Sequence, residues 1–320
     1  MKVVSRRKPK VTECAAIANK IDRDGLTTAA LQTANIVGVA GTPPTGLITF
    51  LTAGAYLDSE GAPRDGRRSC IVEPFTTATI VDSLKGLFVP QEAIGEQYRK
   101  GLMGRDSAGV NWKLDQNVVA QTFGSYSGVN LQANTTAAVG YLTSGWAQYS
   151  TIQLNTASST ATLNAGDVIQ IAGLYATNPQ NRQAYGSGKL RNFVVQSTTT
   201  VGTTATNIVV SPAIIVGGQF QNTIVIGSTS TTAVVTPFNN TGTLSPQNIM
   251  MHRNAFTLAV ADLELPEGVH FAGRASDKEI GLSMRVVRQY TINNDSIPTR
   301  LDVLYGWAPL YPELSCRIAA

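Results

Sequence analysis

Residues 164–173 read NAGDVIQIAG, a turn followed directly by a strand. Asn-Ala-Gly is typical of a tight turn, and the valine and isoleucine residues after it favour extended backbone. Four more short apolar runs follow, each bounded by glycine, serine, threonine or proline, at residues 193–196, 207–210, 223–226 and 233–235. Their spacing predicts a small β-barrel or β-sandwich.

The segment around these runs is almost free of charge. Only four residues between 131 and 250 are charged, compared with 42 in the other 200. A surface helix needs charged residues on its outer face, whereas strands can face solvent with the serine and threonine in which this segment is rich. We therefore predict an all-β domain at residues 131–245. Its charged residues are Asp167, Arg182, Lys189 and Arg191.

The N-terminal flank has helical patterns. Cys14, Ile17 and Ile21 have the spacing of one helix face. Pro74 can open a second helix that reaches residue 87, and residues 91–100 form a third, short helical segment. The uncharged β segment is thus predicted to follow a largely helical region.

The C-terminal flank has a strand pattern. Residues 283–291 and 300–307 both alternate in polarity, and Asn-Asn-Asp between them forms a turn, so the sequence predicts a long hairpin. Tyr305 and Trp307 share one strand face, and we expect both rings to be largely buried. The chain outside the β segment is therefore α+β.

Composition excludes several classes of protein. With 43% hydrophobic and only 14% charged residues among 320, the chain is too apolar to be disordered. Its net charge of +4 comes from the first ten residues, which hold five positive charges, so the remainder carries −1 and does not resemble a dedicated nucleic-acid binder. The cysteines Cys14, Cys70 and Cys316 suit a reducing compartment, and no apolar run is long enough for a membrane span.

Catalytic and metal-binding motifs do not stand out. His252 and His270 lack a second ligand at metal-binding spacing. Acidic residues at 58–60 and 262–267 do not have the spacing of a calcium loop, and the run YGSGKL at 185–190 lacks two defining residues of a phosphate-binding loop. We therefore expect no catalytic, cofactor or metal site, and a structural or binding protein rather than an enzyme.

Several runs in the flanks resemble the major coat proteins of tailed bacteriophages, of the type found in the short-tailed Salmonella phage. They include AGAYL at 53–57, GAPRDGRR at 61–68, MHRNAFTLA at 251–259, MRVVRQY at 284–290 and RLDVLYG at 300–306. The segment NAGDVIQIAG belongs to the same resemblance, which extends from about residue 17 onward.

This resemblance implies the Hong Kong 97-like capsid fold, α+β with an inserted all-β barrel-like domain. Residues 1–38 would be a basic tail and the end of the spine helix, 39–130 and 246–320 the axial and peripheral core, and 131–245 the insertion. It also implies that the N-terminal arm, the extended loop and most of the spine helix are missing, as in a truncated or prophage-remnant copy.

The function implied is that of a major capsid subunit in the virion, made in the bacterial cytoplasm. Its partners would be further copies in pentamers and hexamers, scaffolding and portal proteins, and enclosed DNA bound without sequence specificity; no membrane partner is expected. A β-rich adhesin or carbohydrate-binding module is the alternative.

Charges that are rare in a neutral domain suggest a partner. Arg182, Lys189 and Arg191 lie in or beside one glycine-rich segment of the predicted barrel. We predict that Arg182 and Lys189 lie on an exposed loop, and that this group contacts acidic residues of a neighbouring subunit.

Overall fold

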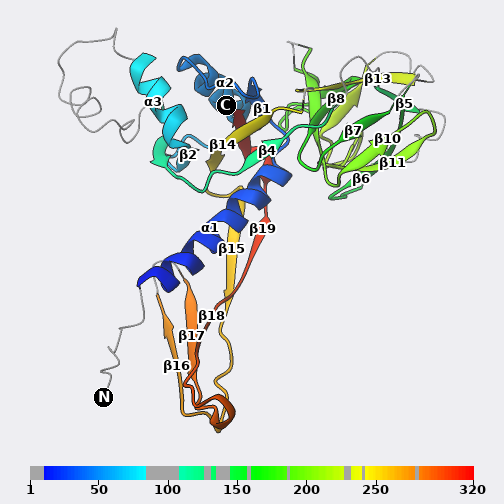
Figure 1. Cartoon of the computed structure of the whole chain (residues 1–320). Coiled ribbons are helices and arrows are strands. Elements are labelled where there is room, and N and C mark those ends of the chain that lie inside the picture. Colours follow the sequence, from blue (N-terminus) through cyan, green and yellow to red (C-terminus); the bar gives the residue numbers. More distant parts are fainter. Residues whose placement is uncertain are drawn as a thin grey trace, which may run out of the picture. The chain divides into compact units, whose positions relative to one another are not determined.

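The computed structural model describes residues 11–83, 108–125, 131–134, 145–156, 160–185, 188–226, 232–239, 242–277 and 281–320 (Figure 1). The chain divides into two compact units. Met1–Gly25 with Phe256–Ala308 form the hairpin unit, and Leu26–Ala255 with Pro309–Ala320 form the core unit. The domain boundaries predicted at residues 38, 130 and 245 differ from the boundaries of these two units, and they stay a prediction.

A mixed sheet is the centre of the core unit, in the order β1-β20-β14-β2-β3, with β4 on the far part of β14. β1 runs parallel to β20, and β2 runs parallel to β3, whereas β14 is antiparallel to its neighbours. The strands are β1 (Ile36–Gly38), β2 (Arg68–Val72), β3 (Asn111–Leu114), β4 (Ala120–Thr122), β14 (Leu244–His252) and β20 (Ser315–Ala319).

Helix α2 (Ile48–Ser59) covers one face of this sheet. Its buried residues Phe50, Ala53 and Leu57 recur at helical spacing and share a core cluster with Cys70 and Cys316 of the sheet. Helix α3 (Pro74–Ser83) adds a further apolar side chain to the same cluster. Pro74 opens α3 as predicted, whereas the predicted extension to residue 87 and the helix at 91–100 lie outside the described residues.

The uncharged segment forms a closed barrel, which confirms its predicted β structure. The strands lie in the order β12-β8-β13-β5-β6-β11-β9, and an additional pairing between β9 and β8 closes the ring, with β12 attached to β8 outside it. The interior is apolar and includes Ile169, Phe193 and Ile208. The strands are β5 (Leu131–Asn134), β6 (Ser150–Thr156), β8 (Val168–Ala176), β9 (Leu190–Val195), β11 (Thr206–Ser211), β12 (Thr223–Val225) and β13 (Thr232–Pro237). A separate pair, β7 (Ala161–Leu163) and β10 (Thr199–Val201), adds to the same core.

Strand β8 closes the barrel because it bends. Its pairing with β9 changes register between Gln170 and Tyr175, and Gly173 between them has φ +86°, which L-residues rarely adopt. The first half of β8 pairs with β13 and the second half with β12. The bulge therefore lets this one strand pair with β9 along one edge and with β13 and β12 along the other.

The barrel packs on the second face of the core sheet. A small cluster joins Val168 and Val194 of the barrel to Ile36 and Ala319 of the sheet. These sheet residues alternate with the side chains that face α2, so they point to the opposite face. Within the core unit, the sheet thus lies between helices and barrel.

The hairpin unit contains the predicted hairpin. β17 (Ser283–Arg288) pairs antiparallel with β18 (Thr299–Asp302) and with β16 (Phe271–Ser276). The second predicted strand is divided, because the chain leaves this sheet after Asp302 and continues as β19 (Leu304–Pro309), which pairs with β15 (Phe256–Ala261). The hairpin is confirmed, and its single long second strand is corrected to two strands in two sheets.

The aromatic residues of β19 lie against helix α1 (Val11–Gln32), whose predicted existence is confirmed. Trp307 donates its indole N–H to the Ile21 carbonyl at 2.9 Å, and Tyr305 donates to the Asp24 carboxylate at 2.7 Å. Both rings are half-buried rather than largely buried. Each phenol or indole hydrogen bond keeps the polar edge of the ring near the surface.

Gly124, beside β4, offers a test of how closely the barrel packs on the core sheet. A Cβ there would lie 2.0 Å from the Thr162 carbonyl oxygen and 2.7 Å from Asp167 Oδ2. Gly124→Ala should therefore lower the free energy of unfolding by about 1–3 kcal/mol, measured by urea denaturation. Gly202→Ala is the matched control, because no atom lies within 4 Å of the place that its added methyl group would take. Equal stability of the two variants would contradict this close approach.

Candidate functional site

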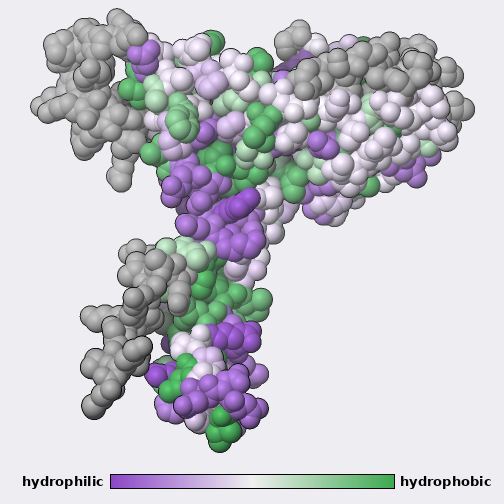
Figure 2. Space-filling view, in the orientation of Figure 1, coloured by the Kyte–Doolittle hydropathy of each residue, from purple (hydrophilic) through white to green (hydrophobic). Residues whose placement is uncertain are grey.

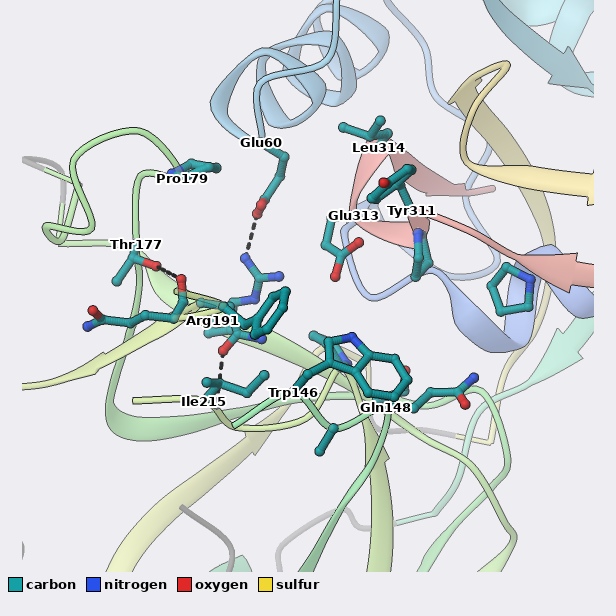
Figure 3. A pocket seen from close by; sticks show the side chains of 18 of the residues that line it. Glu60, Trp146, Gln148, Thr177, Pro179, Arg191, Ile215, Tyr311, Glu313 and Leu314 are labelled. Atoms are coloured by element: carbon teal, nitrogen blue, oxygen red, sulfur yellow. Dashed lines mark hydrogen bonds and ion pairs between the residues drawn. The ribbon is translucent and has the colours of Figure 1, made fainter. Parts of the chain in front are cut away.

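Arg191 of β9 makes a buried ion pair with Glu60, the residue that ends α2. Its Nη1 lies 2.7 Å from Glu60 Oε1, and the side chains are only 5% and 7% exposed (Figure 3). Burial of such a pair costs desolvation energy, which the Coulomb attraction and the hydrogen bond offset. Arg191 therefore joins the barrel to the core helix within one chain.

Lys189 approaches the same helix from the barrel. Its Nζ lies 3.0 Å from the centre of the Tyr56 ring, a cation–π contact, and burial lowers the pKa of this ammonium. Lys189 lies in the loop before β9, as predicted, but it is half-buried and not exposed. Rarity of charge indicates a residue with a specific partner here, but the described contact is made within the chain.

Arg182 is the member of the predicted group that faces solvent. It lies in the loop between β8 and β9, exposed, with φ +58°. The loop is closed by main-chain hydrogen bonds from Arg182 N–H to the Asn178 carbonyl and from Asn178 N–H to the Gln183 carbonyl. The structure therefore brings Lys189 and Arg191 to the core and leaves Arg182 at the surface.

The Arg191–Glu60 pair is one polar junction between the barrel and the rest of the core unit. Asp167, the remaining charge of the barrel, forms a second such junction. Its carboxylate accepts main-chain N–H groups of Asn164 at 2.8 Å and Gly124 at 3.0 Å, and the Gln121 amide at 3.0 Å. Arg317 of β20 donates to Gln121 Oε1 and to the Gly166 carbonyl, both at 2.8 Å. Gln121 thus bridges a buried acid of the barrel and a buried arginine of the sheet.

The pKa values at this second junction are set by burial. Desolvation raises the pKa of Asp167 to about 6, although its hydrogen bonds and Arg317 oppose the shift. Desolvation also lowers the pKa of Arg317 to about 10. Both groups are charged at neutral pH and are held in a water-poor junction.

Sequence reasoning finds the barrel side of both junctions and misses the core side. Glu60 stands out only as one of two neighbouring acids, and neither Arg317 nor the uncharged Gln121 stands out at all. The ion pair joins residues 131 positions apart, a separation that no local pattern indicates.

A cleft of about 720 Å³ opens beside the Arg191–Glu60 pair. Figure 3 shows Trp146, Tyr311 and Glu313 around it, with the Glu313 carboxylate directed into the cleft. Burial raises the pKa of Glu313, and no residue in the described part of the chain makes an ion pair with it. The cleft combines aromatic walls with a carboxylate that lacks its own cation.

Other charged groups that the sequence indicated have structural partners. Asp58 pairs with Arg68 at 2.7 Å and also with Arg64, so the acids at 58–60 are engaged by arginines. His252 is buried with its Nε2 3.2 Å from Asp65. Among the residues that the structure describes, no group of three or more His, Cys, Asp or Glu side chains could hold a metal ion.

The surface of the barrel is poor in charge. Figure 2 shows the visible barrel face as mostly pale, the colour of threonine and serine rather than of charged residues. On the helices, large apolar side chains face solvent: Ile48 is 71%, Leu51 47% and Phe75 76% exposed. No helix in the described ranges is both long and apolar enough to cross a membrane.

A mixed α+β core that carries a closed barrel with mostly buried charges, and large exposed apolar side chains on its helices, is typical of a structural protein that associates through its surfaces. The family model described as P22 coat protein, gene protein 5, matches residues 11–316. The chain therefore belongs to this family and is a major capsid structural protein of a bacteriophage, which confirms the resemblance seen in the sequence. A search of curated proteins finds no match.

Proposed function

We propose that the chain adopts the Hong Kong 97-like capsid fold, with an all-β domain inserted at residues 131–245. The pairing of β4 with β14 carries this proposal. Thr122 and Leu244 are register partners, so the chain leaves the core sheet and returns to it at the same place. Adjacent entry and exit points are what insertion of an independent domain requires. Residues 39–130 and 246–320 would then form the axial and peripheral core.

In this proposal, copies of the chain close into pentamers and hexamers of an icosahedral shell. Each subunit is made in the bacterial cytoplasm, assembles with scaffolding and portal proteins, and encloses DNA without reading its sequence. The low surface charge of the barrel suits contacts between subunits rather than contacts with phosphate. Neither the adhesin alternative nor a truncated copy has support from the family match.

Electron microscopy of the purified protein tests this function. The chain would be expressed in a bacterial cytoplasm, alone and together with a scaffolding protein of the same phage. We expect closed shells of uniform diameter in at least one preparation. Folded protein that remains monomeric in both would contradict a shell-forming role.

A further inference from the structure

The charged residues that line the cleft do not balance. Arg191 is the cation of the group, and its Nη1 is bound to Glu60. Glu313 faces the same space, where burial raises its pKa, the nearby Arg191 lowers it and Glu60 raises it, but no ion pair joins Glu313 to Arg191. Lys189 lies against Tyr56 and does not line the cleft. One carboxylate of the cleft is therefore left without a direct cationic partner among the described residues.

The walls of the cleft also favour a cation. Trp146 is 69%, Phe220 45% and Tyr311 61% exposed, although all three are large aromatic residues of a folded unit. Aromatic faces attract guanidinium and ammonium groups, and guanidinium stacks on them more readily. A carboxylate between such rings is a site for an arginine side chain.

Arg182 has the properties of the missing cation. It is exposed and makes no ion pair with any described residue, and it does not line the cleft of its own chain. Arg64 and Arg67, also exposed in the core unit, are already paired with Asp58 and Asp65. Arg253 and Lys113 of the core unit are exposed as well, but Arg182 belongs to the loop whose residues Thr177 and Pro179 line the cleft. Arg182 and the Glu313 carboxylate are thus complementary in charge.

The positions of the two groups suit contact between two copies. Thr177 and Pro179, in the segment that leads to Arg182, line the cleft, so the loop and the cleft belong to one surface of the core unit. A surface that carries both a donor and its acceptor can pair with itself about a two-fold axis, so that each copy gives and receives one contact.

We propose that Arg182 of one copy enters the cleft of a second copy and binds Glu313 between the aromatic walls. The proposal rests on self-assembly of the chain and names a contact by which the copies join. It retains the predicted intersubunit role for Arg182 and supplies its acidic partner.

Charge reversal in two separate variants tests the contact. Arg182→Glu places two carboxylates at the contact, and Glu313→Arg places two guanidinium groups there. Each variant alone should reduce the yield of assembled protein by about tenfold or more, measured by sedimentation velocity. Arg253→Glu, which reverses another exposed arginine of the core unit outside the cleft, is the matched control and should assemble normally.

Mixing the two variants gives the decisive result. In a mixed pair, one contact joins the side chain introduced by Arg182→Glu to the side chain introduced by Glu313→Arg, which again have opposite charges. The other contact is the original one between Arg182 and Glu313. Assembly should therefore return to within about twofold of the unmodified protein. Circular dichroism and thermal unfolding of the unassembled variants would show that each still folds.

Three outcomes would overturn the proposal. Normal assembly of either single variant would exclude the contact. Rescue by the double variant in one chain but not by mixing would place the contact within a copy instead of between copies. If the unmodified protein does not associate at all, the proposed function fails, and this contact fails with it.

Discussion

Arg317→Met should lower the free energy of unfolding by about 3–5 kcal/mol, the usual cost of removing one partner from a buried charged pair. Arg317 is fully buried and is the cation nearest to the buried Asp167. Without it, Gln121 Oε1 and the Gly166 carbonyl lose their donor, and the Asp167 carboxylate remains in a water-poor site. Methionine keeps most of the volume, so the loss is electrostatic rather than a cavity effect.

Urea denaturation of unassembled protein measures this effect. Arg182→Met is the matched control, because the same substitution at an exposed arginine should change stability by less than about 0.5 kcal/mol. Equal effects of the two substitutions would show that the Arg317 junction does not stabilise the core unit.

The pH dependence of the Arg317 variant provides a second measurement. The pKa of Asp167 is about 6 in the folded protein, above its ordinary value of 3.8, so the folded state binds this proton more tightly than the unfolded chain does. The stability contribution of this group therefore falls as pH rises through that interval. Removal of Arg317 raises the pKa further, so the variant should lose less stability at about pH 5 than at about pH 7.5. A loss of stability that is the same at both pH values would contradict the role of Arg317 in setting the pKa of Asp167.

Arg191→Met should lower the free energy of unfolding by a similar amount, about 3–5 kcal/mol. It leaves the Glu60 carboxylate, 7% exposed, without the guanidinium that lies 2.7 Å away. The double variant Arg191→Met with Glu60→Met removes both charges and should recover most of the loss, because two apolar side chains can pack where two ions were buried.

A double-mutant cycle with the two single variants isolates this ion pair. Arg64→Met with Asp58→Met is an unsuitable control, since Asp58 also binds the buried Arg68. Lys20→Met, which removes an exposed pair with Asp24, is a better one and should have little effect. A double variant that is no more stable than Arg191→Met would show that the two residues act independently.

The sequence predicts the barrel well because its signal is local. Short β-branched runs, turns such as Asn164–Gly166 and the absence of charge all act within a few residues. Helix α2 escapes prediction because ITFLTAGAYL has no charged face, so its buried residues Phe50, Ala53 and Leu57 do not contrast with exposed Ile48 and Leu51. An apolar outer face removes the polar contrast by which helical periodicity is recognised.

The candidate site can be only half predicted. Arg182, Lys189 and Arg191 stand out correctly as unusual, yet charge rarity does not indicate which side of a strand meets the core. Lys189 and Arg191 face Tyr56 and Glu60 because β8 and β9 close the barrel next to α2, a tertiary arrangement. Such packing determines which residues more than a hundred positions apart come into contact, and these contacts leave no local pattern in the sequence.

The pairing of β4 with β14 has a consequence for how the chain folds. Cys70 of β2 and Met250 of β14 are register partners although they are far apart in the chain, and bringing such distant strands together is slow. Register partners within the barrel lie closer together in the chain than Cys70 and Met250 do, from Val195 with Val210 at one extreme to Leu131 with Val235 at the other. If the barrel forms first, its two ends hold Thr122 beside Leu244 and shorten the effective loop that β2 and β14 must close. The barrel would then act as an internal folding nucleus that speeds formation of the core sheet.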